Sequence, residues 1–412
     1  MYSLKFNQST GLIQNFAQKQ VFNILTKITT GKITIEENGM SYNFGKEHKD
    51  LHAVIRVSDP GIYLDIMKDS MIGAGESFMA KKWGVDDLTT AVRILVANRD
   101  VLQQFDQKRN LGKRIVNKIF HWLHQNSQRT AKTNIHAHYD LGNDFFKLFL
   151  DSTMMYSSGI YPKPNSTLEE ASVNKLDVVC QKLELKSEDH LVEIGTGWGG
   201  MAIHAAKEYG CQVTTTTISE EQYRYAKQRV KEQGLEHQIT VLLKDYRELA
   251  GTYDKLVSIE MIEAVGYRFH QQYFQTCQKL LKPTGLMLIQ AITIADQRFE
   301  NYCQNIDFIQ RYIFPGGCLP SNEVIAREVA QSTQMQIIGV QDITIHYAQT
   351  LRDWQKQFQI QRHNVRAMGY SETFCRMWEF YLSYCEGGFR ERAIGTAQFL
   401  IAGSNYRFEE SV

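Results

Sequence analysis

Hydrophobic and polar positions follow two different patterns along the chain, and the change falls near residue 134. Residues 31–45 and 51–59 show short strand-like runs, and residues 88–100 have an apolar helical period. Beyond the change, short buried-strand runs alternate with helical stretches. The pattern predicts a small α+β domain over residues 1–105 and an α/β domain over residues 134–412.

The second domain is predicted to contain a doubly wound parallel sheet. Its strand-like runs are separated by helical sequence and cover residues 190–194, 211–218, 239–245, 253–262 and 285–294. Strands that alternate with helices favour a parallel sheet covered on both faces. Ligands of such sheets bind at the carboxyl ends of the strands, so the residues that follow each strand are candidates for a site.

Basic residues are concentrated between the two predicted domains, over residues 106–133. Against the single acid Asp106, this segment carries Lys108, Arg109, Lys113, Arg114, Lys118, Arg129 and Lys132. Apolar residues recur at helical spacing in the same segment, at Ile115, Ile119, Trp122 and Leu123. The pattern predicts a basic helical linker, which is either a helix that seeks a membrane surface or an ordinary helix packed on its neighbour.

Composition narrows the class of protein. The chain has 412 residues, 22% of them charged, and a formal net charge of +1, so the whole chain is not a polycation that seeks nucleic acid. Its seven cysteines form no CxxC pair, and we expect reduced, mostly buried thiols and no metal site at His136, His138 or Cys318. The N-terminus lacks the apolar core of a signal peptide, and a cytoplasmic protein is expected. The glycines of residues 73–77 are expected to form a turn.

The stretch "VEIGTGWGG", residues 192–200, joins a short buried strand to a glycine cluster. Its G-x-G-x-G-G spacing differs from the G-x-G-x-x-G of dinucleotide folds, but the glycines still permit a tight turn and close approach of a ligand to the backbone. Glu193 lies in the strand before the turn, "TTTIS" ends the second strand, and "KDYREL" ends the third. Three strand ends therefore offer polar groups to one extended ligand, such as an amino-acid head, a ribose and an adenine.

This order of strand ends resembles the class I S-adenosylmethionine (SAM) methyltransferases. The "TIS-x-x-Q" end of the second strand replaces the acidic residue that is common in that class, and it is typical of the cyclopropane fatty acid synthases and their relatives. Further segments that are similar to signatures of this family are "HAHYDLGNDFF" (136–146), "MMYSSGIY" (154–161), "SIEMIEAVG" (258–266), "DFIQRYIFPGGCLPS" (307–321) and "HYAQTLRDW" (346–354). The resemblance covers residue 134 to the C-terminus. It implies a class I SAM-methyltransferase fold and a small N-terminal lipid-associated domain.

The resemblance also implies which residues bind SAM. Carried over residue by residue, they are Tyr156, Ser157, Gly195, Gly197, Thr217, Ile218, Gln222, Asp245 and Tyr246. The glycine loop then lies against the methionine and ribose part of SAM, and Asp245 contacts the adenine.

The family's chemistry explains the remaining residues. An alkene attacks the sulfonium methyl group and leaves a carbocation, which must be kept from water and can be stabilised by aromatic faces. Ring closure then removes a proton from the transferred methyl group, and in the family a bound bicarbonate is the base. The resemblance places around this ion the backbone N–H of Ser158, the backbone of Ile292, and the side chains of Glu263, Gln290 and Tyr347. Ser158 stands where many members have Cys, and Gln290 stands where many have His; a glutamine amide donates a hydrogen bond but does not titrate.

The leading hypothesis is cyclopropanation of unsaturated acyl chains in membrane phospholipids, with the protein associated peripherally with the inner membrane. A second hypothesis keeps the SAM site but yields a methylene or methyl branch on the fatty acid. A third is N-methylation of a small amine, as in plant relatives, and a fourth is a lipid-binding module without catalysis. Family members of this length are often dimers, so a homodimer is an open expectation.

Overall fold

A computed structural model describes residues 8–101 and 141–408, and these fall into two compact units. The first unit holds residues 8–101, 306–312 and 362–391 of the described chain, and the second holds the remainder. Segments from late in the sequence therefore share a unit with the N-terminal sheet. The basic linker predicted over residues 106–133 lies outside the described residues.

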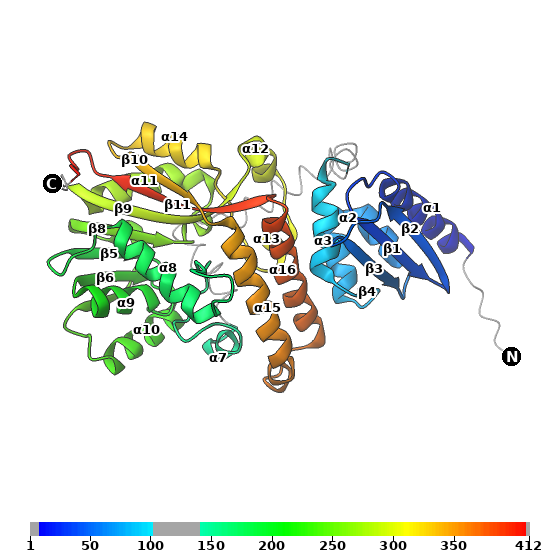
Figure 1. Ribbon diagram of the computed structural model, residues 1–412, viewed down its shortest axis with the longest axis horizontal. Coiled ribbons are helices and arrows are strands. Elements are labelled where there is room, and N and C mark those ends of the chain that lie inside the picture. The colour runs from blue at the N-terminus through cyan, green and yellow to red at the C-terminus, as the bar shows by residue number, and fades with distance from the viewer. Residues whose placement is uncertain (1–7, 102–140, 409–412) are drawn as a thin grey trace. The chain divides into compact units, whose positions relative to one another are not determined.

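The first unit is built on a four-stranded sheet. Its strands are β1 (Lys32–Glu37), β2 (Met40–Gly45), β3 (His52–Val57) and β4 (Trp83–Val85), in the order β2-β1-β3-β4, and β1 and β3 are parallel. Its helices are α1 (Gln8–Leu25), α2 (Gly61–Met79), α3 (Leu88–Ala97), α13 (Phe308–Tyr312) and α16 (Glu372–Arg390). The α+β character predicted for the N-terminal part is therefore present (Figure 1).

The expected turn at residues 73–77 is wrong, because these residues lie inside α2. The helix is instead interrupted earlier, at Asp69 and Ser70, where the backbone is not helical. A Cβ at Gly75 would lie 2.6 Å from the ring of Phe308, so glycine is needed there for close packing rather than for a turn. Nothing in the local sequence distinguishes these two uses of glycine.

The second unit contains a seven-stranded sheet with the order β10-β11-β9-β8-β5-β6-β7. The strands are β5 (His190–Ile194), β6 (Gln212–Thr217), β7 (Ile239–Leu243), β8 (Tyr253–Ile259), β9 (Leu281–Ile294), β10 (Gln336–Asp342) and β11 (Ile394–Ala402). The five strands predicted from the sequence are all present and mutually parallel. The sheet is not wholly parallel, since β11 runs antiparallel to both of its neighbours.

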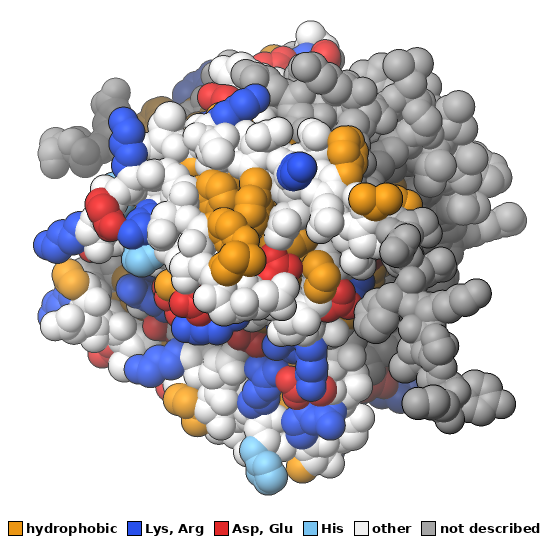
Figure 2. Space-filling view, turned by 90° about the vertical axis from the view of Figure 1, so that its right-hand side faces the viewer, with side chains coloured by type: hydrophobic (Ala, Val, Ile, Leu, Met, Phe, Trp, Pro, Cys, Tyr) orange, Lys and Arg blue, Asp and Glu red, His pale blue; other side chains and the backbone are white. Residues whose placement is uncertain are grey.

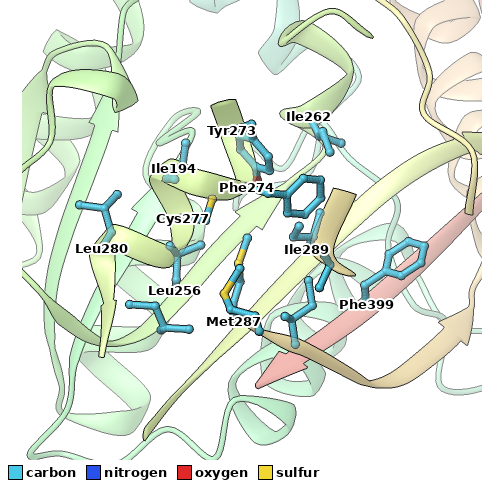
Figure 3. Close-up of a cluster of buried hydrophobic side chains, with 14 of the residues drawn as sticks. Ile194, Leu256, Ile262, Tyr273, Phe274, Cys277, Leu280, Met287, Ile289 and Phe399 are labelled. Carbon is cyan, nitrogen blue, oxygen red and sulfur yellow. The ribbon is translucent and has the colours of Figure 1, made fainter. Parts of the chain in front are cut away.

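Helices cover both faces of this sheet, as predicted (Figure 1). On one face, α8 (Leu168–Lys182), α9 (Gly200–Tyr209) and α10 (Glu220–Glu232) contribute buried residues to one core cluster. On the other face, α11 (His270–Leu280) and α14 (Asn322–Ser332) contribute to a second cluster. Figure 3 shows Tyr273, Phe274 and Cys277 of α11 in this second cluster, together with Leu256 and Met287 of the sheet.

The second unit contains further helices. They are α7 (Asn143–Lys147), α12 (Asp296–Gln304), α15 (Thr344–Ala367), whose last residues belong to the first unit, and the short 3-10 helices η1 (Tyr246–Glu248), η2 (Ile262–Ala264) and η3 (Tyr267–Phe269). Both η1 and η2 follow the carboxyl ends of sheet strands. In the described part of the chain, no helix is both long enough and apolar enough to cross a membrane.

Apolar side chains are also exposed on the first unit. On α1, Leu12, Ile13 and Phe16 are 72%, 56% and 58% exposed, and Met40 at the start of β2 is 54% exposed. Figure 2 shows a group of apolar side chains surrounded by polar and charged ones on the face that it presents. A concentration of exposed apolar residues is unusual on a surface that contacts only water.

Candidate active site

The glycine-rich turn links β5 to α9 at the carboxyl edge of the sheet. Gly195, Gly197 and Gly199 have φ values of +102°, +53° and +87°, a region that glycine enters without steric cost. A Cβ at Gly195 would lie 3.3 Å from the Met261 side chain, whereas no described atom lies within 4 Å of a Cβ built at Gly197. The turn thus exposes bare backbone beside open space, where a ligand can approach closely.

Hydrogen bonds between side chains hold this turn against β6. The carboxylate of Glu193, only 3% exposed, accepts a hydrogen bond of 2.6 Å from Thr215 Oγ1, and the hydroxyls of Thr215 and Thr196 lie 2.7 Å apart. Burial raises the pKa of Glu193 to about 8, and the bond from Thr215 opposes that rise. The predicted acid in the strand before the turn is therefore a buried group that fixes the turn's position.

The predicted residues of the second and third strand ends lie at the same edge. Thr217 Oγ1 donates to Gln222 Oε1 at 2.8 Å, so these two candidates are held together at the start of α10. Asp245 accepts three hydrogen bonds from Arg247, two from the guanidinium at 2.8 and 2.6 Å and one from the backbone N–H at 3.0 Å. The two oxygens of a carboxyl group together have about four lone-pair sites, so Asp245 can still accept from a further donor.

Two further SAM candidates lie beside these strand ends. Ile218 is in the link between β6 and α10, and Tyr246 begins η1. Tyr246 is 9% exposed, and its hydroxyl has no hydrogen-bond partner among the described residues. Burial raises the pKa of this phenol. Its ring belongs to the core cluster that includes α11 and lies edge to face with Tyr273, with ring centroids 5.6 Å apart.

The segment before α8 brings Tyr156 and Ser157 to the site. Ser157 Oγ lies 3.1 Å from Nζ of Lys175, a lysine with 0% exposure on α8. Burial lowers the pKa of Lys175 to about 8, while the nearby charge of Glu260 opposes that shift. The buried lysine thus orients Ser157 and adds positive charge near the carboxyl groups of Glu260 and Glu193.

A carboxylate that the sequence did not single out lies at the centre of the predicted catalytic residues. Oε1 of Glu260 accepts hydrogen bonds from the backbone N–H of Ser158 at 2.9 Å and from Nε2 of Gln290 at 2.8 Å. Its Oε2 accepts one from the hydroxyl of Tyr347 at 2.7 Å. Burial raises the pKa of Glu260, and these three hydrogen bonds oppose the rise because they stabilise the ionised form.

The second carboxyl group of the site belongs to Glu263, three residues further on. Its Oε1 accepts a hydrogen bond of 2.5 Å from the backbone N–H of Ile292, and its buried Oε2 has no partner among the described residues. Burial raises the pKa of Glu263 to about 8, and the charge of Glu260 adds to the rise. The three hydrogen bonds therefore favour the ionised form of Glu260, and the raised pKa favours the protonated form of Glu263.

An orienting chain of amides supports Gln290. Gln398 Nε2 donates to Gln290 Oε1 at 2.9 Å, and Lys182 Nζ donates to Gln398 Oε1 at 2.6 Å. A lysine can only donate, so the amide oxygen of Gln398 must face Lys182 and its N–H must face Gln290. The amide oxygen of Gln290 then accepts from Gln398, and its N–H points toward Glu260.

Aromatic rings lie next to the carboxylates. Tyr156 stacks on Trp354 with ring centroids 5.1 Å apart, and Tyr347, which binds Glu260, lies edge to face with Trp354 at 6.1 Å. The rings of Phe146 and Phe314 lie 5.3 and 6.3 Å from that of Tyr156. The site thus combines apolar walls with a buried base, an arrangement that excludes water and offers ring faces to a cation.

The structure brings together all five predicted catalytic residues, but around two carboxyl groups rather than one. Ser158, Gln290 and Tyr347 meet at Glu260, and Ile292 binds Glu263. Sequence reasoning missed the roles of Glu260 and Lys175. Glu260 could have been found, because it lies within the family-like segment "SIEMIEAVG". Nothing in the sequence indicated Lys175, since a lysine on a helix is usually exposed.

A mostly parallel sheet with a glycine turn after β5, and with polar groups after the next two strands β6 and β7, is the arrangement of the class I SAM-dependent methyltransferases. Comparison with known proteins agrees. The sequence profile of the family described as mycolic acid cyclopropane synthetase matches residues 126–399. The chain belongs to this family of SAM-dependent methyltransferases.

Two relatives show how much of the chain is shared. The chain is 38% identical to tuberculostearic acid methyltransferase of Mycobacterium tuberculosis, over 82% of this chain and 80% of the relative. It is 36% identical to cyclopropane-fatty-acyl-phospholipid synthase of Escherichia coli, over 83% and 86% of the two chains. Among solved structures, the mycolic acid cyclopropane synthase CmaA1 of the complex with SAH and CTAB superposes with a TM-score of 0.62 at 31% identity, covering 66% of this chain and 98% of that one. Cyclopropane synthase MmaA2 from M. tuberculosis gives the same values.

Proposed function

We propose that this protein transfers a one-carbon unit from SAM to the cis double bond of unsaturated acyl chains in membrane phospholipids and closes a cyclopropane ring. The observation that carries the proposal is the position of the glycine turn beside the carboxylates. Met261, whose side chain faces Gly195, stands between Glu260 and Glu263 in the sequence. A methyl donor bound at the turn therefore lies next to a buried base.

The residues present fit SAM. The bare backbone of Gly195 and Gly197 and the acceptor sites of Asp245 suit its amino-acid, ribose and adenine parts, and Tyr246 follows Asp245 directly in the chain. The other proposed contacts come from Tyr156, Ser157, Thr217, Ile218 and Gln222. When bound, SAM supplies an electrophilic methyl group on a sulfonium ion.

The chain's own residues then explain how an alkene can react here. Attack of the alkene on the methyl group leaves a carbocation on the acyl chain, which the ring faces of Tyr156, Trp354 and Tyr347 stabilise by cation–π interaction. The same rings keep water away, since water would trap the cation as an alcohol. Loss of a proton from the transferred carbon then closes the ring, and a buried carboxylate is suited to accept it.

Two observations favour a second candidate product, in which the fatty acid carries a methylene or methyl branch instead of a ring. Gln290 cannot titrate, so it holds a base in place but does not share its proton. Several relatives are also named for methyl addition, among them a probable fatty acid methyltransferase of Pseudomonas putida at 32% identity. Ring and methylene branch share every step up to the carbocation, and both lose a proton from the transferred carbon. The methylene forms when a hydride first shifts from the methyl-bearing carbon to the neighbouring cationic carbon, and a methyl branch then needs a separate reductase with a hydride donor.

We also propose that the N-terminal domain (residues 1–105) brings the catalytic domain (134–412) to the bilayer. The exposed Leu12, Ile13 and Phe16 lie on one side of α1, with the exposed Lys19 close by on the same helix. Apolar side chains can enter the acyl boundary while lysines contact anionic head groups. Replacing Leu12 and Phe16 with serine should reduce co-sedimentation with anionic vesicles but leave SAM binding unchanged.

The test of the proposed function uses SAM with a deuterated methyl group and vesicles of monounsaturated phospholipid. Products are separated by chromatography and identified by mass spectrometry. A saturated ring product that retains two deuterium atoms supports cyclopropanation, and an exocyclic alkene with two deuterium atoms supports the branched product. Vesicles of saturated phospholipid are the matched control and should take up no label. If no lipid is labelled while a small amine is, the proposal is wrong and the protein is an amine methyltransferase.

A further inference from the structure

The donors that would bind bicarbonate are already engaged by side chains of the protein. The backbone N–H of Ser158 and the hydroxyl of Tyr347 each have a single hydrogen to donate, and both donate to Glu260. Gln290 Nε2 donates to Glu260 and to the carbonyl oxygen of Ser158. The N–H of Ile292 donates to Glu263. A bicarbonate ion bound here would lie beside two carboxyl groups, and none of these four residues would have a free hydrogen to donate to it. The residues present therefore do not fit a bound bicarbonate.

The backbone at Glu260 also indicates a functional demand. Glu260 has a φ of +49°, a left-handed conformation that is uncommon for any residue except glycine. Its N–H donates to the carbonyl oxygen of Gln290 at 2.7 Å, which holds the end of β8 against β9 in this conformation. Unfavourable backbone geometry of this kind persists where the side chain is needed in one position.

We infer that the carboxylate of Glu260 replaces bicarbonate as the base that accepts the proton from the transferred methyl group. This inference rests on the proposed function and names the base for its last step. The alkene's π electrons form a bond to the methyl carbon as the carbon–sulfur bond breaks, and the sulfur leaves as a neutral thioether. One C–H bond of the transferred carbon then breaks, its electron pair forms the last carbon–carbon bond of the ring, and Glu260 takes the proton.

The surroundings of the two carboxyl groups assign the roles. Three donors hold Glu260, and the chain Lys182–Gln398–Gln290 directs an N–H at it, so Glu260 is the group that carries the negative charge. Glu263 has one donor and a buried oxygen without a partner among the described residues, so it is the group that stays protonated. A glutamine at position 290 suits this arrangement, since it needs only to donate to one neighbour and accept from another.

Two variants of Glu260 test whether this residue acts as a base or has only a structural role. Glu260→Gln keeps the size of the side chain but removes its basicity, so transfer should fall by about 100-fold or more, as for loss of a general base. Glu260→Gly removes the side chain, suits the positive φ, and frees the three donors around a space for a small anion. Added bicarbonate should restore activity to Glu260→Gly and not to Glu260→Gln.

The experiment measures label transfer in buffer freed of carbon dioxide and again with added bicarbonate, for the wild type and both variants. SAM binding by calorimetry shows whether each variant keeps its fold. The expected result is a wild type that is indifferent to bicarbonate, a Gln variant that is inactive in both buffers, and a Gly variant that recovers with bicarbonate. A wild type that needs bicarbonate overturns the inference and leaves the proposed function intact.

A second measurement does not depend on turnover. Binding of ¹³C-labelled bicarbonate, followed by its nuclear magnetic resonance line width, should be detected for Glu260→Gly and not for the wild type. Binding by the wild type overturns the inference, because the ion would then share the site with Glu260. If the wild type labels no lipid, the proposed function is wrong, and so is the catalytic role of Glu260. The binding comparison would still show whether the Glu260 carboxylate occupies the position where bicarbonate would bind.

Discussion

Replacing Tyr347 with phenylalanine removes one of the three hydrogen bonds to the Glu260 carboxylate and keeps the ring that packs near Trp354. The lost bond is 2.7 Å long and reaches Oε2, whereas the other two donors reach Oε1. A hydrogen bond to a charged group contributes about 1.5–3 kcal/mol. Because the lost bond stabilises the ionised form, its loss should raise the pKa of Glu260 further, and the free-energy cost corresponds to about 10- to 100-fold in the ionisation equilibrium.

The sign of the effect on activity follows from the role of Glu260. A base works in its ionised form, so a higher pKa moves the acid limb of the rate profile to higher pH. Activity of Tyr347→Phe should therefore fall about 10- to 100-fold on the acid side and recover toward the wild-type value at alkaline pH. The assay is the initial rate of label transfer from SAM to monounsaturated vesicles, measured across the pH range.

Tyr63→Phe is the matched control for this variant. Tyr63 donates to a glutamate, Glu37, at 2.9 Å in the first unit, so the same kind of bond is lost outside the site. The control should leave the pH profile unchanged even if it lowers the melting temperature. A Tyr347→Phe enzyme whose activity falls equally at every pH would refute the reasoning, because the hydroxyl would then act on something other than the protonation of Glu260.

Three further predictions follow from the structure. Gly195→Val should abolish SAM binding measured by calorimetry, because valine is strained at a φ of +102° and its side chain would press on Met261; tight binding would show that the turn does not face SAM. Folding raises the pKa of Glu263 from its ordinary value of 4.5 to about 8, so the folded protein binds this proton more tightly than the unfolded chain does. Between pH 4.5 and about 8, the unfolding free energy should therefore fall by up to about 1.4 kcal/mol per pH unit. Glu263→Gln should therefore flatten the fall in unfolding free energy over this range, and an unchanged slope would contradict the assignment. Gly75→Leu should destabilise the first unit by about 1–3 kcal/mol in thermal unfolding, because a Cβ there already lies 2.6 Å from Phe308; unchanged stability would show that the helix shifts freely.

Several features of the fold could be predicted because they are repeated or local. The alternation of strand and helix fixes a layered α/β arrangement, since each apolar face must be buried. The glycine spacing predicted a tight turn, and Gly195 and Gly197 have positive φ values in it. The antiparallel β11 was not predicted, because its apolar run does not reveal which neighbours it pairs with.

The sequence by itself predicted the class of sheet, the glycine turn after β5 and the residues that meet around Glu260 and Glu263. Only the tertiary structure decided how those residues pair. Glu260 meets Ser158 and Tyr347 across 102 and 87 positions of the chain, and a motif does not record which lone pair each donor will reach. Each donor hydrogen serves about one acceptor, and only the folded chain shows that the donors of Ser158, Gln290 and Tyr347 are directed at Glu260.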